Sequence, residues 1–265
     1  MLQEGAQAKS VKQLFDLSGR VAIITGGSIG LGRQMAEGLA EMGAHLVLCA
    51  RKKERCQEAA EDLQKLGVKA LALACDVKSP ASIQEVVDTA LARFGRIDIL
   101  INNAGISWGA PAEQMPLEDW TKVLDTNLTG TFLCAQAIGK VMIKQGRGKI
   151  INVASVAGLG GAQRGTVQAI GYHASKGGVI AFTKDLACQW AAHNIQVNAI
   201  APGWFPTHMS GWVIEHKKEL LLEQIPLRRF GNDHDLKGAA VFLASAASDY
   251  VTGHVLVVDG GQTAW

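Results

Sequence analysis

The regular alternation of apolar runs and amphipathic segments constrains the fold of this chain more than any other feature. Short, nearly continuous apolar stretches are followed by stretches of helical periodicity from residue 20 to residue 258. Continuous apolar strands are expected where both faces of a sheet are covered, as in parallel sheets joined by helices. The pattern therefore predicts an α/β fold with a single-domain, doubly wound parallel sheet of the Rossmann-like type and helices on both faces.

The expected elements are bounded by glycines and polar residues. Strands are expected at 20–25, 45–50, 69–75, 97–101, 149–153, 195–200 and 255–258, and helices at 30–43, 52–66, 81–94, 117–142, 172–192 and 235–246. Several of these helices end at a glycine, which is typical of helix C-termini. No linker rich in proline or serine divides the chain. We therefore expect an N-terminal extension at 1–18 and one domain at 19–265.

Composition excludes several classes of partner. The 265 residues are 48% hydrophobic and 19% charged, and the net charge of +2 predicts no nucleic-acid partner. Five scattered cysteines without a C-x-x-C pair, and seven histidines without an H-E-x-x-H motif, predict reduced thiols and no metal site. No apolar segment is long enough to span a membrane, and no signal peptide is recognisable. We expect a cytoplasmic protein that binds neither membrane nor nucleic acid.

A glycine-rich turn directly follows the first expected strand. It runs Thr25-Gly26-Gly27-Ser28-Ile29-Gly30-Leu31-Gly32, a G-x-x-x-G-x-G pattern rather than G-x-G-x-x-G. Glycine allows close approach of backbone to a ligand, and the following helix offers unpaired N–H groups to a pyrophosphate. The turn predicts a dinucleotide site that involves Thr25, Gly26, Ser28, Ile29, Gly30 and Gly32. The alternative is a tight strand–helix turn without a ligand.

The ends of the next strands extend this prediction. The second strand ends at Arg51 without an acidic residue that would bind the ribose hydroxyls, and a guanidinium there suits a 2′-phosphate. We therefore expect NADP as the cofactor, with NAD as the alternative if Arg51 is only a solvated cation. Asp76 and Val77 follow the third strand, and Asn103, Ala104 and Gly105 follow the fourth. These residues are expected to pack along the cofactor, with plain loops as the alternative.

Tyr172 and Lys176 lie one helical turn apart, on the same face of an expected helix. An isolated tyrosine has a pKa of about 10, and a neighbouring ammonium favours the phenolate. The pair is therefore a candidate general acid and base tuned towards neutral pH. Taken alone, this spacing is common on surface helices and carries little weight.

The motifs together resemble the short-chain dehydrogenase/reductase family. The matching residues, in chain order, are Thr25-Gly26-x3-Gly30-x-Gly32, Asn102-Asn103-Ala104-Gly105, Asn127, Ser155, Tyr172-x3-Lys176 and Pro202-Gly203. The resemblance covers about residues 15–262. Within the family the chain is most similar to the members that include gluconate 5-dehydrogenases and 3-oxoacyl-carrier-protein reductases.

The resemblance implies a role for each matching residue. Tyr172 would be the proton donor and acceptor, and Lys176 would lower its pKa and bind the nicotinamide ribose. Ser155 would hold the substrate oxygen, and Asn127 would orient Lys176 through water. Pro202, Gly203 and Thr207 would contact the nicotinamide end of the cofactor. The family also implies a homotetramer formed by the helices at 117–142 and 172–192 and by the C-terminal strand.

The substrate side is less readable. The resemblance implies a mobile lid at about 203–226, in which Trp204 and Phe205 would cover the substrate. Trp108 is expected to line the same pocket. Ser155 and Tyr172 are separated by seventeen positions, a few more than is usual, and the insertion at 158–166 would place Gln163 at the pocket mouth. The alternatives are packing of these aromatics against the body and an exposed loop tip.

The sequence thus predicts an NADP-dependent oxidoreductase that interconverts a carbonyl and a secondary alcohol. The expected substrate is a sugar acid such as gluconate, or a 3-oxoacyl compound. The alternative is an NAD-dependent polyol or sugar-acid dehydrogenase. A non-catalytic nucleotide-binding regulator would not need Asn127, Ser155, Tyr172 and Lys176 together. An epimerase or dehydratase is disfavoured because no sizeable substrate domain follows the sheet, and an enoyl reductase because of Ser155 and the Tyr-x3-Lys spacing.

Overall fold

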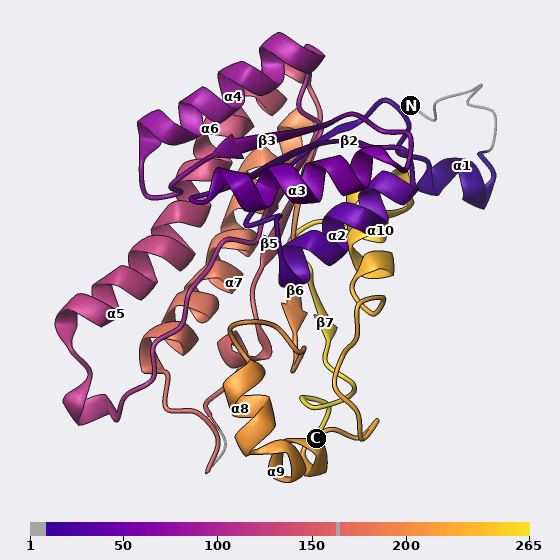
Figure 1. Cartoon of the computed structure of the whole chain (residues 1–265). Helices are drawn as coiled ribbons and strands as arrows, with labels where there is room; N and C mark the ends of the chain where they lie inside the picture. Colours follow the sequence, from indigo (N-terminus) through magenta and orange to yellow (C-terminus); the bar gives the residue numbers. More distant parts are fainter. Residues whose placement is uncertain (1–8, 163–164) are drawn as a thin grey trace.

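Seven parallel strands form the central sheet, in the order β3-β2-β1-β4-β5-β6-β7 (Figure 1). This computed structural model describes residues 9–162 and 165–265. The strands are β1 (Val21–Thr25), β2 (His45–Ala50), β3 (Ala70–Ala74), β4 (Ile99–Asn102), β5 (Gly148–Val153), β6 (Ile195–Pro202) and β7 (Val255–Val258). Every neighbouring pair is parallel. The predicted doubly wound sheet is confirmed.

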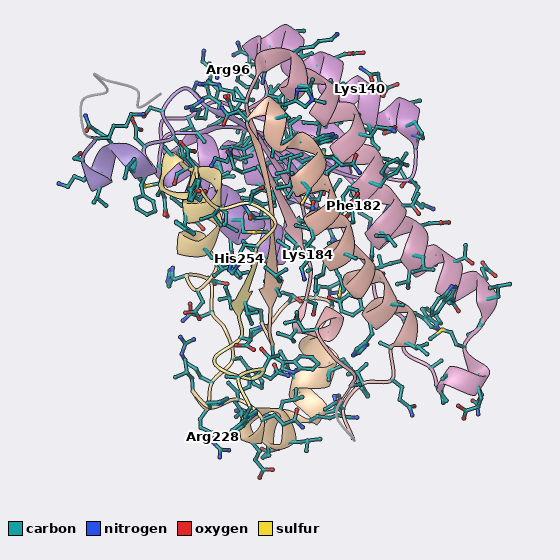
Figure 2. The ribbon with its side chains drawn as sticks, turned by 180° about the vertical axis from the view of Figure 1, so that it is seen from behind. Arg96, Lys140, Phe182, Lys184, Arg228 and His254 are labelled. Atoms are coloured by element: carbon teal, nitrogen blue, oxygen red, sulfur yellow. The ribbon has the colours of Figure 1, made fainter. Side chains whose placement is uncertain are left out.

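Two apolar layers explain why the strands are continuous apolar runs. On one face, β1 and β2 pack against α2 (Gly30–Glu41), α3 (Lys53–Gln64) and α10 (Lys237–Ala244). On the other face they pack against α4 (Pro80–Phe94), α6 (Gly130–Gln145) and α7 (Ile170–Trp190). Figure 1 shows the first layer in front, and Figure 2, turned by 180°, shows α6 and α7 in front. Both strand faces are therefore dry, as the sequence predicted.

The helix expected at 117–142 is interrupted. It comprises α5 (Leu117–Leu124), a π-helical segment η2 (Asp125–Thr129) and α6. A π segment adds one residue to a turn, and such segments often occur at functional sites. The prediction of one regular helix is wrong at η2, because the change in hydrogen bonding leaves no mark on the apolar periodicity.

The described part of the expected N-terminal extension is attached to the domain. Residues Val11–Phe15 form a short helix, α1, which a reciprocal capping box between Ser10 and Gln13 begins. Leu17 follows it and is 1% exposed within the core beside α2.

The point where the strand order reverses positions the site. β1 lies between β2 and β4, so the connections from β1 and β4 leave the sheet towards opposite faces. Beyond the carboxyl end of β6 the chain continues into two short helices, α8 (Gly211–His216) and α9 (Lys218–Glu223), which Figure 1 shows at the lower end of the molecule.

Candidate active site

The glycine turn forms a cradle that only small residues allow. Gly26 and Gly30 have φ values of 63° and 56°, in the left-handed region. A Cβ atom on Gly32 would collide with the carbonyl oxygen of Gly26. Helix α2 begins at Gly30, and its N-cap residue Ile29 makes no capping hydrogen bond through its side chain. The first-turn N–H groups therefore remain available, and this part of the site fits the pyrophosphate of a dinucleotide.

A polar connection fixes the ends of β1 and β4 to each other. The Thr25 hydroxyl accepts hydrogen bonds from the backbone N–H groups of Asn103 and Ala104, both at 3.0 Å. The Asn103 side chain donates to the carbonyl oxygens of Thr25 and Gly26, also at 3.0 Å. The side-chain N–H groups of Asn103 therefore hold the glycine turn in place and are not available to the cofactor.

The residues expected at the adenosine end occupy different environments. Arg51 is exposed, and in the described part of the chain it has no hydrogen bond or ion pair. The Asp76 carboxylate accepts a hydrogen bond from the Lys78 backbone N–H at 3.0 Å. Val77 is 8% exposed and packs where Gly130 leaves room for it.

Tyr172, Ser155 and Lys176 meet at the carboxyl end of β5. The Ser155 side chain lies beside the Tyr172 hydroxyl, close enough to lower its pKa. The Lys176 ammonium lies 5.6 Å from the centroid of the Tyr172 ring and donates to the carbonyl oxygen of Val153 at 2.6 Å. The structure thus brings together three side chains that the sequence placed on one strand end and one helix face.

Burial dominates the protonation equilibria of this group. It raises the pKa of Tyr172 above its usual value, and the neighbouring Ser155 side chain opposes that rise. Burial also lowers the pKa of Lys176 to about 8, since Lys176 is only 4% exposed. Burial and Ser155 account for the shift at Tyr172, and the expected lowering of its pKa by Lys176 stays a prediction.

Asn127 is a buried connecting residue on the π segment η2. Its Oδ1 accepts from the Ile106 backbone N–H at 2.8 Å, and its Nδ2 donates to the Ile106 carbonyl oxygen at 2.9 Å. Nδ2 also donates to the Ser175 hydroxyl at 3.0 Å, and Ser175 donates to the Tyr172 carbonyl oxygen at 2.8 Å. Asn127 thus connects the loop after β4 to α7, and its expected action on Lys176 through water stays a prediction.

Gly105 explains why this arrangement needs a small residue after β4. A Cβ atom there would lie 3.3 Å from Asn127 Oδ1 and 3.7 Å from Lys176 Nζ.

The residues expected at the nicotinamide end lie at the end of β6 and just after it. Pro202 is the last residue of β6, and a Cβ atom on Gly203 would collide with the Asp259 backbone. Thr207 lies next to the glycine turn, since a Cβ atom on Gly30 would meet its methyl group at 3.4 Å.

The residues expected to contact the substrate do not all face one pocket. Trp108 is 47% exposed and Trp204 is half-buried. Phe205 is 4% exposed and belongs to the core, where its ring packs against Gly231. The expectation that Phe205 covers the substrate is therefore wrong, because the ring points into the core below the lid. Gln163 lies outside the described residues.

Sequence reasoning missed three participants. Ser175 joins Asn127 to α7, and its position three residues after Tyr172 was the available signal. The Val153 carbonyl oxygen, which accepts from Lys176, is a backbone group and carries no sequence signal. Lys217 contacts the insertion and looked like an ordinary surface lysine.

The described residues include neither a metal-ligand cluster nor a membrane-spanning helix. No group of three or more metal-ligating side chains lies together among them. None of their helices is both long and apolar enough to cross a membrane.

Comparisons with known proteins agree with this geometry. Residues 20–218 match the family model described as short chain dehydrogenase. A gluconate 5-dehydrogenase of Gluconobacter oxydans is 40% identical over 94% of this chain and 97% of its own. A 3-oxoacyl-[acyl-carrier-protein] reductase of Aquifex aeolicus is 40% identical over 93% of this chain and 98% of its own.

A solved structure gives the same result in three dimensions. A gluconate 5-dehydrogenase from Burkholderia cenocepacia, in complex with NADP and tartrate, superposes with a TM-score of 0.91. The two chains are 40% identical, and the match covers 97% of this chain and 100% of that one. The family inferred from the motifs is confirmed: this protein belongs to the short-chain dehydrogenase/reductase family of nicotinamide-dependent oxidoreductases.

Proposed function

We propose that the protein is an NADP-dependent dehydrogenase that interconverts a ketone and a secondary alcohol on a sugar acid of the gluconate type. One observation carries the proposal: Ser155, Tyr172 and the buried Lys176 ammonium lie together at the carboxyl end of β5. The glycine cradle on the same edge of the sheet fits a dinucleotide. The Gluconobacter and Burkholderia relatives, both gluconate 5-dehydrogenases, support the substrate class.

The protein's own groups divide the work. When bound, the nicotinamide ring supplies or takes up the hydride. Ser155 and Tyr172 both hydrogen bond the substrate oxygen, and this holds the reacting carbon in one orientation. Tyr172 gives its proton to that oxygen during reduction and receives it during oxidation. Lys176, held at Val153, stabilises the phenolate that forms when Tyr172 gives up its proton.

Cofactor choice rests on Arg51. Its guanidinium is exposed at the end of β2 with no protein partner in the described residues, so it is available to a 2′-phosphate. We expect Arg51→Gln to weaken NADPH binding about tenfold and to leave NADH binding unchanged, because only NADPH carries the 2′-phosphate. Fluorescence titration with both cofactors measures this, and equal losses for the two would contradict the assignment.

The remaining family features belong to the same proposal. Residues 203–226 form the substrate lid, and the N-terminal segment 1–18 precedes one catalytic domain at 19–265.

The protein is a homotetramer that pairs through α6 and α7, whose outer faces are uncovered in Figure 2. On α6, Phe132 is 43% exposed and meets Phe182 of α7 edge to face, with 6.2 Å between the ring centroids. Light scattering of the wild type and Phe132→Asp tests this, since the substitution should yield smaller species.

A substrate screen tests the proposal as a whole. Nicotinamide absorbance is followed with gluconate, 5-ketogluconate, polyols and a 3-oxoacyl thioester, each with NADP(H) and NAD(H). The expected result is the highest kcat/KM for the gluconate pair with NADP(H). A preference for the 3-oxoacyl thioester would overturn the substrate class, and a preference for NAD(H) would overturn the cofactor.

A further inference from the structure

The two helices of the lid are attached to the body in different ways. Helix α9 is anchored, because Leu221 is fully buried and Ile225, just beyond its end, is 1% exposed. Helix α8 buries no residue, and its Trp212 is 65% exposed and stacks on His216 of the same helix, with 4.3 Å between the ring centroids. Lys217 is the single residue between the two helices. The lid therefore has a fixed base at α9 and a loosely held front at α8.

Lys217 reaches across from this junction to the insertion at 158–166. Its ammonium donates to the carbonyl oxygen of Gly165 at 2.7 Å and to that of Thr166 at 2.6 Å. Gly165 also lies against the fixed base, since a Cβ atom on it would be 3.4 Å from the Leu220 side chain. Charged hydrogen bonds are roughly twice as strong as neutral ones, so these contacts hold the loop more firmly than a neutral donor would.

The held loop leads directly into the catalytic helix. The Ala110 N–H donates to the Gln168 carbonyl oxygen at 2.9 Å, and Ala110 and Ala169 form an isolated parallel bridge. Helix α7 begins at Ile170, two residues before Tyr172. Residues 165–169 thus contact Lys217 at one end and Ala110 at the other. They lie shortly before Tyr172, the proposed proton donor.

We propose that Lys217 is a positioning residue, which holds residues 165–169 against the fixed base of the lid and so shapes one wall of the substrate site. This inference rests on the proposed function for the location of that site. It makes Lys217 a determinant of substrate affinity, because the loop must be ordered before the substrate finds its wall in place. The glycine cradle is built by other elements, so cofactor affinity does not depend on Lys217.

The neighbouring lysine provides a matched control. Lys218 is the first residue of α9 and is exposed, and its side chain has no hydrogen bond or ion pair in the described part of the chain. Lys217→Met and Lys218→Met remove the same charge one residue apart, but only the first removes the contacts with the loop. Lys217→Arg keeps a cation with several N–H donors and serves as the conservative rescue.

The experiment combines hydrogen exchange with steady-state kinetics on the full-length protein. In Lys217→Met we expect faster amide exchange confined to 165–169 and a KM for the sugar-acid substrate raised about tenfold, with kcat changed much less. NADPH affinity should be unchanged. Lys218→Met should match the wild type, and Lys217→Arg should recover most of the protection and of the KM.

Each departure from these results has one meaning. Unchanged exchange at 165–169 in Lys217→Met, or the same KM as in Lys218→Met, would overturn the inference. Faster exchange spread over the whole chain would also overturn it, because Lys217 would then serve only general stability. Hydrogen exchange can be measured without substrate. If exchange in Lys217→Met is faster only at 165–169 but the wild type is inactive on every sugar acid, the loop contact is supported and the proposed function is refuted.

Discussion

The buried base of the site and its substrate mouth are built on opposite principles. At the base, Asn127, Ser175 and Lys176 are each less than 5% exposed and are held by hydrogen bonds between strand ends and helices. At the proposed mouth, Trp108 and Trp212 are 47% and 65% exposed, and Lys217 binds the carbonyl oxygens of Gly165 and Thr166. The proposed reacting groups therefore sit on rigid elements, whereas we expect substrate choice to depend on loops.

This division gives a rule for substitutions. Changes in the base and the layers beneath it should alter the free energy of unfolding or kcat, because they disturb packed and hydrogen-bonded groups. Changes at the mouth should alter KM and leave stability nearly untouched.

Phe205 lies in the lid sequence but belongs structurally to the core. Phe205→Ala should lower the free energy of unfolding by about 3–5 kcal/mol, because it leaves a cavity beside Gly231. Urea unfolding measures the change. A loss of less than about 1 kcal/mol, together with a raised KM, would instead indicate that Phe205 contacts the substrate and contributes little to the core.

Lys176 should make stability depend on pH. Its pKa in the folded protein is about 8, below the 10.5 of an unfolded lysine, so burial of its charge destabilises the fold at and below pH 8. Between pH 8 and 10.5 the unfolded chain binds more protons at this residue, and the free energy of unfolding should therefore rise with pH. The gain is on the order of 3 kcal/mol.

Lys176→Met is the comparison that isolates this effect. The variant lacks the titrating group but retains every other one, including Lys149, whose pKa burial also lowers. Urea unfolding of both proteins at pH 7.5 and pH 10 should show that the free energy of unfolding rises more with pH in the wild type than in the variant. Parallel changes in the two proteins would mean that Lys176 titrates as an ordinary surface lysine.

Trp212 represents the mouth, and the smallest change in stability is expected there. Trp212→Ala should change the free energy of unfolding by no more than about 0.5 kcal/mol, because the side chain is 65% exposed and stacks on His216 of its own short helix. The KM for the substrate should rise severalfold if α8 covers the site. Unfolding and initial-rate measurements check both parts, and a large loss of stability would erase the contrast with Phe205.

The sequence was a good guide wherever local patterns decide structure. The strands at His45–Ala50 and Val255–Val258 have the predicted bounds, since apolar runs between polar residues leave little freedom. Thr25, Gly26 and Gly32 form the predicted cradle because the close backbone approach there allows no larger residue at Gly32.

Other features depend on contacts that no local pattern records. The π segment at Asp125–Thr129 changes hydrogen bonding without changing the apolar spacing. Phe205 follows a strand end like a lid residue, yet its ring fills space that Gly231 leaves, far along the chain. Lys217 meets a loop more than fifty residues earlier, and nothing in its own neighbourhood distinguishes it from Lys218.

The central claim is that the base of the site, through Tyr172, performs the proton transfer. The most direct measurement is kcat of Tyr172→Phe on the preferred substrate, together with the NADPH dissociation constant. We expect kcat to fall about 10²–10⁴-fold and NADPH affinity to stay essentially unchanged, because Tyr172→Phe removes the hydroxyl that exchanges a proton with the reacting oxygen. A kcat within a few-fold of the wild type would contradict it.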